Sequence, residues 1–225
     1  MGGAAEGRDA SYHHGDLPAA LFEAVRQTIN ERGVAGLSLR EVARRVGVSH
    51  AAPAHHFRNK AGLLTAFATA GYGRLAQSVV AEVTSSAPAD GAVLLAAVGR
   101  GYVRFALASR EQFEVMFRVD LLDADDPEFV AASEAAYSLL QTTIERCRQE
   151  GRLGGRDPEV VAVGAWSLVH GFAALWLSGR LAERIDETDP HRLAAAIAAL
   201  YVESVLLKPQ IGHERFGSQR RGERE

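Results

Sequence analysis

Apolar side chains recur every three or four residues over most of the chain, which is the period of an amphipathic helix. In the first 80 residues this pattern predicts four helices: one over residues 16–33, two short ones over 38–47 and 49–57, and a longer one that begins at Lys60. The apolar positions that define them are Leu21, Ala24, Val25, Ile29, Leu39, Val42, Ala43, Val46, Leu63, Leu64, Phe67 and Leu75.

A tight turn separates the two short helices. Ser38 and Glu41 form a capping-box pattern at the start of the first one, and Gly47 ends it. Ser49 stands where its hydroxyl would cap the second. The sequence therefore predicts a helical hairpin with a glycine turn.

The same period continues toward the C-terminus. Helices are expected over 93–108, 110–119, 127–149, 159–178 and 191–207, with breaks at 123–127, 151–158 and 184–190. Since no long stretch alternates apolar and polar residues with a period of two, we expect an all-α fold. It would consist of an N-terminal three-helix domain that contains the hairpin and a larger C-terminal helical domain.

Composition divides the chain further. The Gly-, Ala- and polar-rich N-terminal residues predict a flexible arm, the polar C-terminal residues predict a frayed tail, and the loop-like segment SSAPADG marks a boundary. The expected parts are an arm over 1–15, a helix-turn-helix domain over 16–60, a connecting helix over 61–84, a helical domain over 90–210 and a polar tail over 211–225.

Charge is distributed unevenly along the chain. The net charge is −3, but residues 1–60 hold eight Lys and Arg against six Asp and Glu, whereas residues 61–225 hold 17 against 22. The two parts are therefore +2 and −5, which indicates different partners. The single cysteine, Cys147, excludes an internal disulfide and favours a reducing, cytoplasmic location, with a buried thiol as its expected role. The N-terminal residues lack the apolar core of a signal peptide.

One uncharged segment raises the question of a membrane span. Residues 160–179 contain no Asp, Glu, Lys or Arg, and 20 residues are enough to cross a bilayer. Small residues dilute the segment, and it includes Ser167 and His170, which also suits a soluble helix buried on every side. Because no second hydrophobic span is evident, we favour the buried helix.

The hairpin has the chemistry of a DNA reader. A helix-turn-helix places its second helix in the major groove, and small residues early in that helix allow a close approach to the bases. Ala51 and Ala52 suit contact with thymine methyl groups, and Arg40 suits a bidentate contact to guanine. Hydrogen bonds to phosphates or base edges are expected from His50, His55 and His56. Spacing alone does not distinguish this reading from an ordinary helical hairpin with a solvated histidine edge.

A longer run of residues resembles a known family. From about Tyr12 to Phe67 the chain is similar to the DNA-binding domain of the tetracycline-repressor-like (TetR) family of bacterial regulators. The resemblance rests on LSLREVARRVGVS (37–49), Ala52-Pro53, His56-Phe57, Asn59-Lys60, Leu63-Leu64 and, in one branch of the family, Tyr12-His13-His14-Gly15.

The resemblance implies a role for each matching position. Its implied DNA-binding residues are Ser38, Arg40, Ser49, His50, Ala51, Ala52, His55, His56 and Lys60, with Lys60 on a phosphate. Ala54 departs from the pattern, because the family usually places there a tyrosine that contacts the DNA backbone. Two alternatives follow: the affinity for DNA is lower without this ring, or the arm, with Arg8, His13 and His14, compensates for it. Pro53 is interpreted as a structural residue of the first turn.

The resemblance also implies that the last two long helices form a homodimer. Their apolar stripes suit a four-helix bundle with a symmetry mate, which would bury the uncharged segment. The expected interface residues are Trp166, Val169, Ala173, Trp176, Leu177, Leu193, Ile197, Leu200, Tyr201 and Val205, and close approach is expected at Gly164, Ala165, Gly171 and Ala174. Trp166, His170 and Gly171 also resemble a W-x-x-x-H-G signature of one subgroup.

The family's second domain implies a small, as yet unidentified effector. An apolar ligand with one hydrogen-bonding group would suit Tyr102, Phe105, Phe113, Met116, Phe117, Tyr137, Trp166 and His170. For each of these residues taken singly an ordinary core position is favoured over a ligand contact, and for His170 a satisfied core or interface histidine is favoured.

No enzyme chemistry is expected. Cys147 and His170 lie on different predicted helices without a nucleophile signature, and no G-x-S-x-G, P-loop or H-E-x-x-H pattern occurs. Neighbouring histidines on a helix point about 100° apart, so the pairs at 13–14 and 55–56 predict no metal site, and no cofactor is implied.

The sequence therefore predicts a DNA-binding transcriptional regulator, a ligand-responsive repressor that binds a pseudo-palindromic operator as a homodimer. An effector would shift the helix from Lys60 onward and change the spacing of the two readers. The expected partners are double-stranded operator DNA, a second copy and a small apolar ligand, and no membrane. Two alternatives remain: an effector-independent DNA-binding protein whose C-terminal helices only dimerise, and a membrane-associated sensor that inserts residues 160–179.

Overall fold

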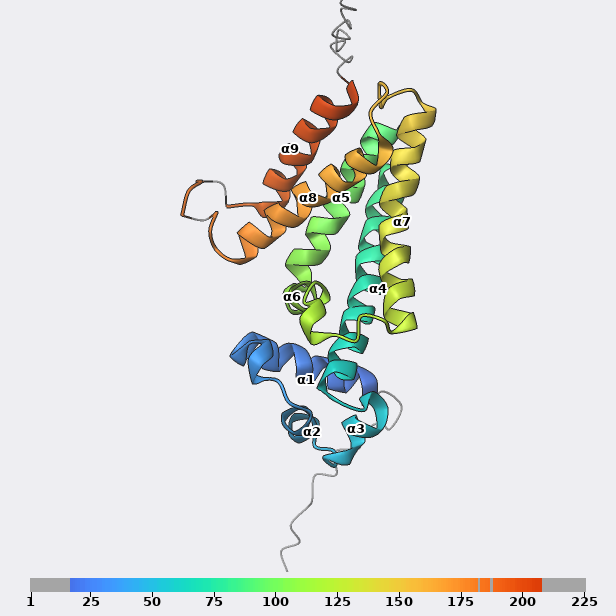
Figure 1. Ribbon diagram of the computed structural model, residues 1–225. Helices are drawn as coiled ribbons and strands as arrows, with labels where there is room; N and C mark the ends of the chain where they lie inside the picture. The colour runs from blue at the N-terminus through green and yellow to red at the C-terminus, as the bar shows by residue number, and fades with distance from the viewer. Residues whose placement is uncertain (1–16, 182, 187, 208–225) are drawn as a thin grey trace, which may run out of the picture. The chain divides into compact units, whose positions relative to one another are not determined.

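The computed structural model describes residues 17–207 apart from 182 and 187, and these residues form helices joined by short loops (Figure 1). The helices are α1 (Leu17–Arg32), α2 (Leu39–Val46), α3 (Ala51–Phe57), α4 (Lys60–Ser86), α5 (Gly91–Ala108), α6 (Arg110–Met116), α7 (Pro127–Gln149), α8 (Pro158–Leu177) and α9 (Pro190–Val202). Since no strand occurs in this part of the chain, the prediction of an all-α fold is confirmed. The expected arm with Arg8, His13 and His14 and the polar tail lie outside the described residues.

The C-terminal ends of two helices differ most from the sequence prediction. Helix α6 ends at Met116 rather than near 119, because Arg118 leaves the helical region (φ −94°, ψ 66°) and the chain enters the short turn η2 (Val119–Leu121). The helix expected over 191–207 is α-helical as far as Val202 and continues as the π-helical turn η3 (Glu203–Leu207).

Residue contacts divide the chain into two compact units. The first contains the described residues 17–72 together with 109–132, and the second contains 73–108 together with the described residues from 133 onward. Helices α4 and α7 each contribute residues to both units. The loop at 85–91, expected as a domain boundary, instead lies within the second unit. Two of the divisions between the units fall within the continuous helices α4 and α7, where the helical pattern of the sequence shows no break.

In the first unit, Phe22 of α1 joins three helices. Its ring lies 5.9 Å from that of Phe57 at the end of α3 and 5.7 Å from that of Phe67 on α4. Leu21, Val25, Val42, Ala43, Leu63 and Leu64 of the same unit are almost fully buried. Burying each of the larger of these side chains stabilises the fold by about 1.5–3 kcal/mol, so this small core holds the hairpin in place.

In the second unit, α5 is the central helix. It contacts α8 and α9, and Val103 packs with Phe172 and Ala194 in a shared apolar cluster. A Cβ on Gly101 would lie 2.6 Å from the Cα of Val79, so glycine permits the close crossing of α4 and α5. The buried carboxylate of Glu82 on α4 pairs there with Arg100 (3.1 Å) and Arg104 (2.5 Å) of α5. These contacts hold the second half of α4 against α5.

Two helices, α5 and α8, are long and apolar enough to cross a membrane. The expectation of a single hydrophobic span is therefore wrong. The two helices differ in burial, since 67% of the apolar window of α5 is buried within the protein but only 28% of that of α8. The expectation that α8 is buried on every side is also wrong for a single chain.

Candidate nucleic-acid interface

Helix α2 begins at the predicted cap. Ser38 has an extended backbone (φ −145°, ψ 152°), and its hydroxyl accepts a hydrogen bond from the backbone N–H of Glu41 at 3.2 Å. Gly47 ends the helix in the left-handed region (φ 76°), where a side chain would be strained. The two ends of α2 are thus fixed by local contacts that place Ser38 and Arg40 at its exposed N-terminal turn.

Acidic side chains hold two of the three arginines of α2. Glu41 accepts hydrogen bonds from Arg44 (2.8 and 3.0 Å) and Arg45 (3.0 Å), and Arg45 also pairs with Glu31 of α1. The hydrogen bond from Arg44 is the largest cause that lowers the pKa of Glu41, to about 2. Arg40 is exposed and has no carboxylate within ion-pair distance among the described residues. Its guanidinium is therefore available to an external anion or base.

Helix α3 presents small and imidazole side chains. His50, Ala51, His55 and His56 are exposed, Ala52 and Ala54 are half-buried, and Pro53 is fully buried in the hairpin interior, as expected. The predicted side-chain cap from Ser49 is wrong. The N-cap residue is His50, which makes no capping side-chain bond, and Ser49 contributes its carbonyl to the N–H of Ala52 at 3.0 Å. The exposed hydroxyl of Ser49 is thus not used as a cap.

Lys60 anchors the start of α4. Its ammonium donates to the carbonyl of Val34 at 3.1 Å, and the side chain is half-buried. Lys60 therefore joins α4 to the turn that follows α1, an intramolecular role that the sequence did not reveal. The ammonium has three donor hydrogens, so this bond leaves the implied phosphate contact possible.

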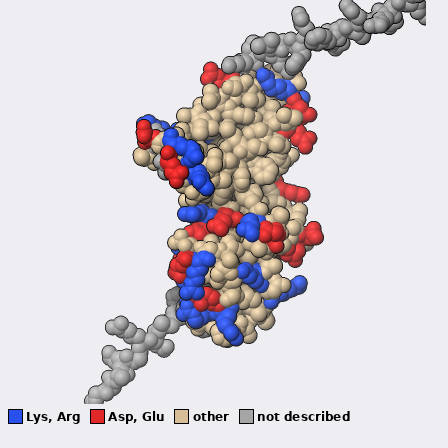
Figure 2. Space-filling view, turned by 60° about the vertical axis from the view of Figure 1, so that its left-hand side comes forward, with Lys and Arg blue, Asp and Glu red and all other residues tan. Residues whose placement is uncertain are grey.

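The surface of this region is positively charged. Residues 17–60 contain seven Lys and Arg against three Asp and Glu, a net formal charge of +4. Figure 2 shows Lys and Arg side chains gathered over the part of the surface formed by α1–α3. An exposed hairpin with small residues at the start of its second helix and excess positive charge is the arrangement that DNA readers use.

Most of the candidate ligand residues fall into two groups, one in each unit. Tyr102, Tyr137, Trp166 and His170 meet in the second unit. The hydroxyl of Tyr102 lies 2.8 Å from Nδ1 of His170 and accepts from the indole N–H of Trp166 at 3.4 Å, and the rings of Tyr137 and Trp166 are 5.8 Å apart. Burial lowers the pKa of His170, which favours its neutral form.

The remaining candidates do not join this group. Phe113 and Phe117 pack at 5.5 Å in the first unit, and Met116 is fully buried there against Gly71. Phe105 is buried in the second unit. The sequence list therefore mixes residues of two cores, because aromatic spacing carries no information on which core a residue joins.

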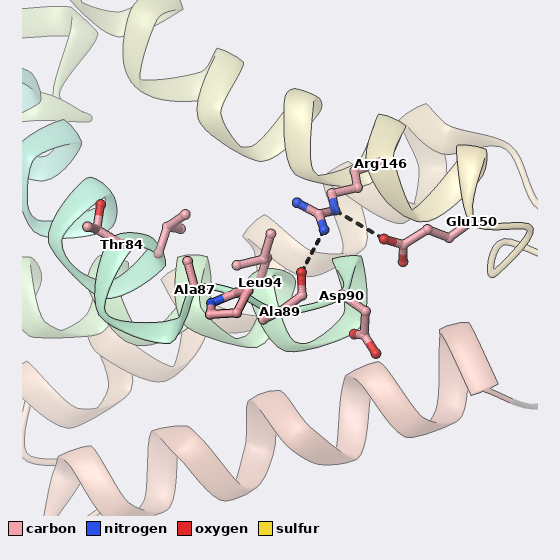
Figure 3. A pocket seen from close by; sticks show the side chains of 9 residues that line it. Thr84, Ala87, Ala89, Asp90, Leu94, Arg146 and Glu150 are labelled. Atoms are coloured by element: carbon pink, nitrogen blue, oxygen red, sulfur yellow. Dashed lines mark hydrogen bonds and ion pairs between the residues drawn. The ribbon is translucent and has the colours of Figure 1, made fainter.

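An open groove in the second unit contains none of the candidate ligand residues. It has a volume of about 700 Å³ and lies between the C-terminal ends of α4 and α7 and the start of α5. As Figure 3 shows, Arg146 donates to Glu150 (3.0 Å) and to the carbonyl of Ala89 (2.7 Å). Glu150 also accepts from the N–H of Gly91, so the main polar groups of the groove bind one another.

Helices α8 and α9 expose an apolar face. On α8 the face follows residues three or four apart: Val160, Val163, Ser167, Gly171, Ala174 and Leu175; on α9 it includes Ala196, Ala199 and Leu200. Val160 and Leu200 are 68% and 64% exposed, unusual values for large apolar side chains. In Figure 2 the surface over these helices carries few charged side chains. Uncharged faces of this kind mark contact sites.

Several expected interface residues instead belong to the chain's own core. Ala173 is fully buried, so its place in a subunit interface is a wrong prediction. Val169, Trp176, Leu193 and Ile197 pack against the cluster of Val103, Phe172 and Ala194, and Leu177, Tyr201 and Val205 are half-buried. Trp166 and Leu200 are exposed, and so are Val160, Val163 and Leu175, which the predicted interface did not include.

Small residues on α8 have two different environments. A Cβ on Gly164 would lie 2.7 Å from the hydroxyl of Tyr201, which donates to the carbonyl of Val161 at 2.8 Å. Gly164 thus permits the close approach of α8 and α9 within one chain. A Cβ on Gly171 would meet nothing within 4 Å, so this glycine leaves space on the exposed face.

Comparison with known proteins agrees with this geometry. Residues 21–76 match the family described as bacterial regulatory proteins, tetR family, and residues 95–201 match the tetracyclin repressor-like C-terminal domain. The chain is 25% identical over 181 residues to an HTH-type transcriptional repressor of Mycobacterium tuberculosis, covering 79% of this chain and 87% of that protein. It is 28% identical over 170 residues to the HTH-type transcriptional regulator BetI of Rhizobium meliloti, covering 68% and 74%.

A solved structure shares the fold over nearly the whole chain. A protein of unknown function from Rhodococcus superposes with a TM-score of 0.74 and 30% identity, covering 88% of this chain and all of that one. The helix-turn-helix and the all-α second unit define a DNA-binding regulator. The chain belongs to the tetR family of transcriptional regulators, which are not enzymes.

The exposed guanidinium of Arg40 leads to a first prediction. Arg40→Ala should weaken binding to the preferred DNA duplex by about 10- to 100-fold, because a bidentate contact to a base contributes about 1–3 kcal/mol. Arg44→Ala removes the same charge from the same helix, but its guanidinium is already bound by Glu41, so the loss should be several times smaller. Equilibrium titrations of both variants check this, and equal losses would contradict the distinction between the two arginines.

Proposed function

We propose that the protein is a ligand-responsive repressor that binds a pseudo-palindromic operator as a homodimer. The observation that carries this proposal is one chain with two exposed surfaces of different chemistry. One is the positively charged hairpin surface of α2 and α3, and the other is the apolar face of α8 and α9. The first suits a phosphate backbone and a major groove, and the second suits a copy of itself.

The hairpin residues have assigned roles in this proposal. The bases are contacted by Arg40 and by the exposed start of α3, with His50, Ala51 and Ala52. The DNA backbone or the edge of the groove is contacted by Ser38, Ser49, His55, His56 and Lys60. Small residues at 51 and 52 bring the helix axis close to the bases. At Ala54 no aromatic ring is available for a backbone contact.

The dimer is proposed to form through α8 and α9. Two helices from each subunit make a four-helix bundle, in which Val160, Val163, Leu175 and Leu200 lose their contact with water. Since a two-fold interface uses the same patch twice, the small residues Gly171 and Ala174 would face their counterparts closely. A dimer that binds a pseudo-palindromic operator would present its two copies of α3 to half-sites about one helical turn of DNA apart.

The proposed effector site is the group of Tyr102, Tyr137, Trp166 and His170. Aromatic faces suit an apolar ligand, and the pair of Tyr102 and His170 supplies a polar group for orientation. Tyr102 follows Gly101 on α5, at the close crossing with α4, so a ligand that moves α5 would also move α4.

We further propose that the protein belongs to the subgroup of the family with the W-x-x-x-H-G motif and that it is located in the cytoplasm.

Selection from random duplex DNA tests the proposed function. The expected product is a two-fold symmetric sequence, bound by the protein with an affinity that falls steeply with salt because phosphate contacts release counterions. Weak binding without enrichment would contradict operator recognition. Enrichment of an asymmetric half-site would contradict the dimer but not the reader.

A further inference from the structure

Arg58 lies in a backbone conformation that side chains rarely adopt. Among the described residues it is the one non-glycine residue with positive φ, at 61°, with ψ −58°. The N–H of Asn59 donates to the carbonyl of Phe57 across it at 2.6 Å, which makes a γ-turn of the rare, strained type. The turn directly follows helix α3 and precedes α4.

Contacts on both sides hold this turn. The N–H of Arg58 donates to the carbonyl of Ala54 at 2.9 Å, and the side chain of Asn59 accepts from the N–H of Gly62 at 2.9 Å. A Cβ on Gly62 would lie 2.1 Å from the carbonyl oxygen of Phe57, so the first turn of α4 presses against the end of α3. With the ring of Phe57 packed on Phe22, the backbone at position 58 has little freedom.

Glycine would satisfy this backbone without strain, yet the position carries an arginine. Strained residues persist where the surrounding structure fixes them, and they concentrate at functional sites. The Arg58 side chain is exposed, and no carboxylate among the described residues lies within ion-pair distance of it. It thus differs from Arg44 and Arg45, which Glu41 holds, and from Lys60, whose ammonium binds Val34.

We propose that Arg58 is a phosphate-contact residue that fixes the C-terminal end of the recognition helix on the DNA backbone. The assignment rests on the proposed DNA-binding function. The guanidinium presents paired N–H donors that match two phosphate oxygens, and such contacts set the register of a reader without selecting sequence. Arg58 thus supplies a contact to the DNA backbone at the end of α3, where Ala54 has no aromatic ring to make one.

The test measures salt-dependent binding of the full-length protein to a duplex enriched by the wild-type protein from a random pool, and to an unrelated duplex of equal length. Arg58→Ala should lose about tenfold or more in affinity for both duplexes, since hydrogen bonds between charged groups are lost. The slope of log affinity against log salt should become shallower by about 0.9 for each lost phosphate contact, or about 1.8 for a dimer. Arg58→Lys should retain most of the slope, because the charge remains.

Two further variants separate this role from general effects. Arg26→Ala removes the same charge from α1, where Glu23 holds the guanidinium, and should leave the slope unchanged. Arg58→Gly removes the guanidinium and also relieves the strain of the positive-φ backbone at this position. It should lose the same affinity as Arg58→Ala and melt at an equal or higher temperature than that variant, which is the reverse of the usual order of Gly and Ala.

The results of these measurements separate failure of the Arg58 assignment from failure of the proposed function. An unchanged affinity and slope for folded Arg58→Ala or Arg58→Gly, with tight binding by the wild-type protein, would overturn the assignment of Arg58 and leave the proposed function intact. A loss confined to the enriched duplex would also overturn it, because a phosphate contact is insensitive to sequence. Failure of the wild-type protein to bind any duplex would overturn the proposed function together with this assignment.

Discussion

Leu200→Glu is expected to convert the proposed dimer into a monomer. The side chain is 64% exposed in the single chain, so the substitution leaves the fold of the subunit largely intact. A central apolar contact contributes about 2 kcal/mol or more to the free energy of association. Because a two-fold interface contains this residue from both subunits, the substitution removes that contribution twice. The dimer dissociation constant should therefore rise by a factor on the order of 1,000, since each 1.4 kcal/mol is tenfold. Sedimentation equilibrium measures it directly.

DNA binding should decline together with dimerisation. A monomer holds one half-site, so affinity for a symmetric duplex should fall by about 100-fold or more. Val80→Glu is the matched control, because Val80 is an exposed valine of the second unit that lies on α4 rather than on α8 or α9. A Leu200→Glu protein that sediments as the wild type does would refute the α8–α9 interface.

Gly62→Ala should destabilise the hairpin unit, although it adds a single methyl group. The new Cβ would lie 2.1 Å from the carbonyl oxygen of Phe57 and 3.2 Å from its carbon, and backbone atoms do not move aside as side-chain ends do. We expect a cost of about 2–3 kcal/mol, visible as a fall in Tm of about 5 °C or more. Because α3 ends at this contact, affinity for DNA should decline as well.

A second glycine on the same helix gives the control. A Cβ on Gly73 would meet nothing within 4 Å. Gly73→Ala should therefore stabilise the protein by about 0.5–1 kcal/mol, since alanine loses less conformational entropy in a helix. Calorimetry of the two variants should show Tm shifts of opposite sign. Shifts of the same sign would show that the contact of α3 with α4 differs from the one described.

Local signals made helix α2 predictable from the sequence. The hydroxyl of Ser38, the N–H of Glu41 and the backbone of Gly47 interact within one short segment, so their pattern in the sequence is also their pattern in space. The carboxylate of Glu41 is different. It binds Arg44 and Arg45 rather than completing the capping box, and Arg45 in turn reaches Glu31 fourteen residues away. This part of the network depends on how α1 packs on α2.

The face of α8 shows what the sequence does not determine. The helix is apolar nearly all round, so its composition does not reveal that Ala173 is fully buried while Val163 is exposed. Packing inside the unit decides this. The same holds for Phe113 and Tyr102, which look alike as core aromatics but belong to different units. The strained turn at Arg58 is a third case, because the close contact of Gly62 with Phe57 imposes it.

Mapping the phosphates that the protein protects on the enriched duplex tests whether it binds DNA as a two-fold dimer. A dimer that reads DNA with α3 predicts two protected patches related by a two-fold axis, with their centres one helical turn (about 34–36 Å) or a multiple of it apart. Both patches should weaken at low protein concentration in the Leu200→Glu variant. A single patch, or uniform protection that does not depend on sequence, would contradict the proposal of a dimeric operator-binding regulator.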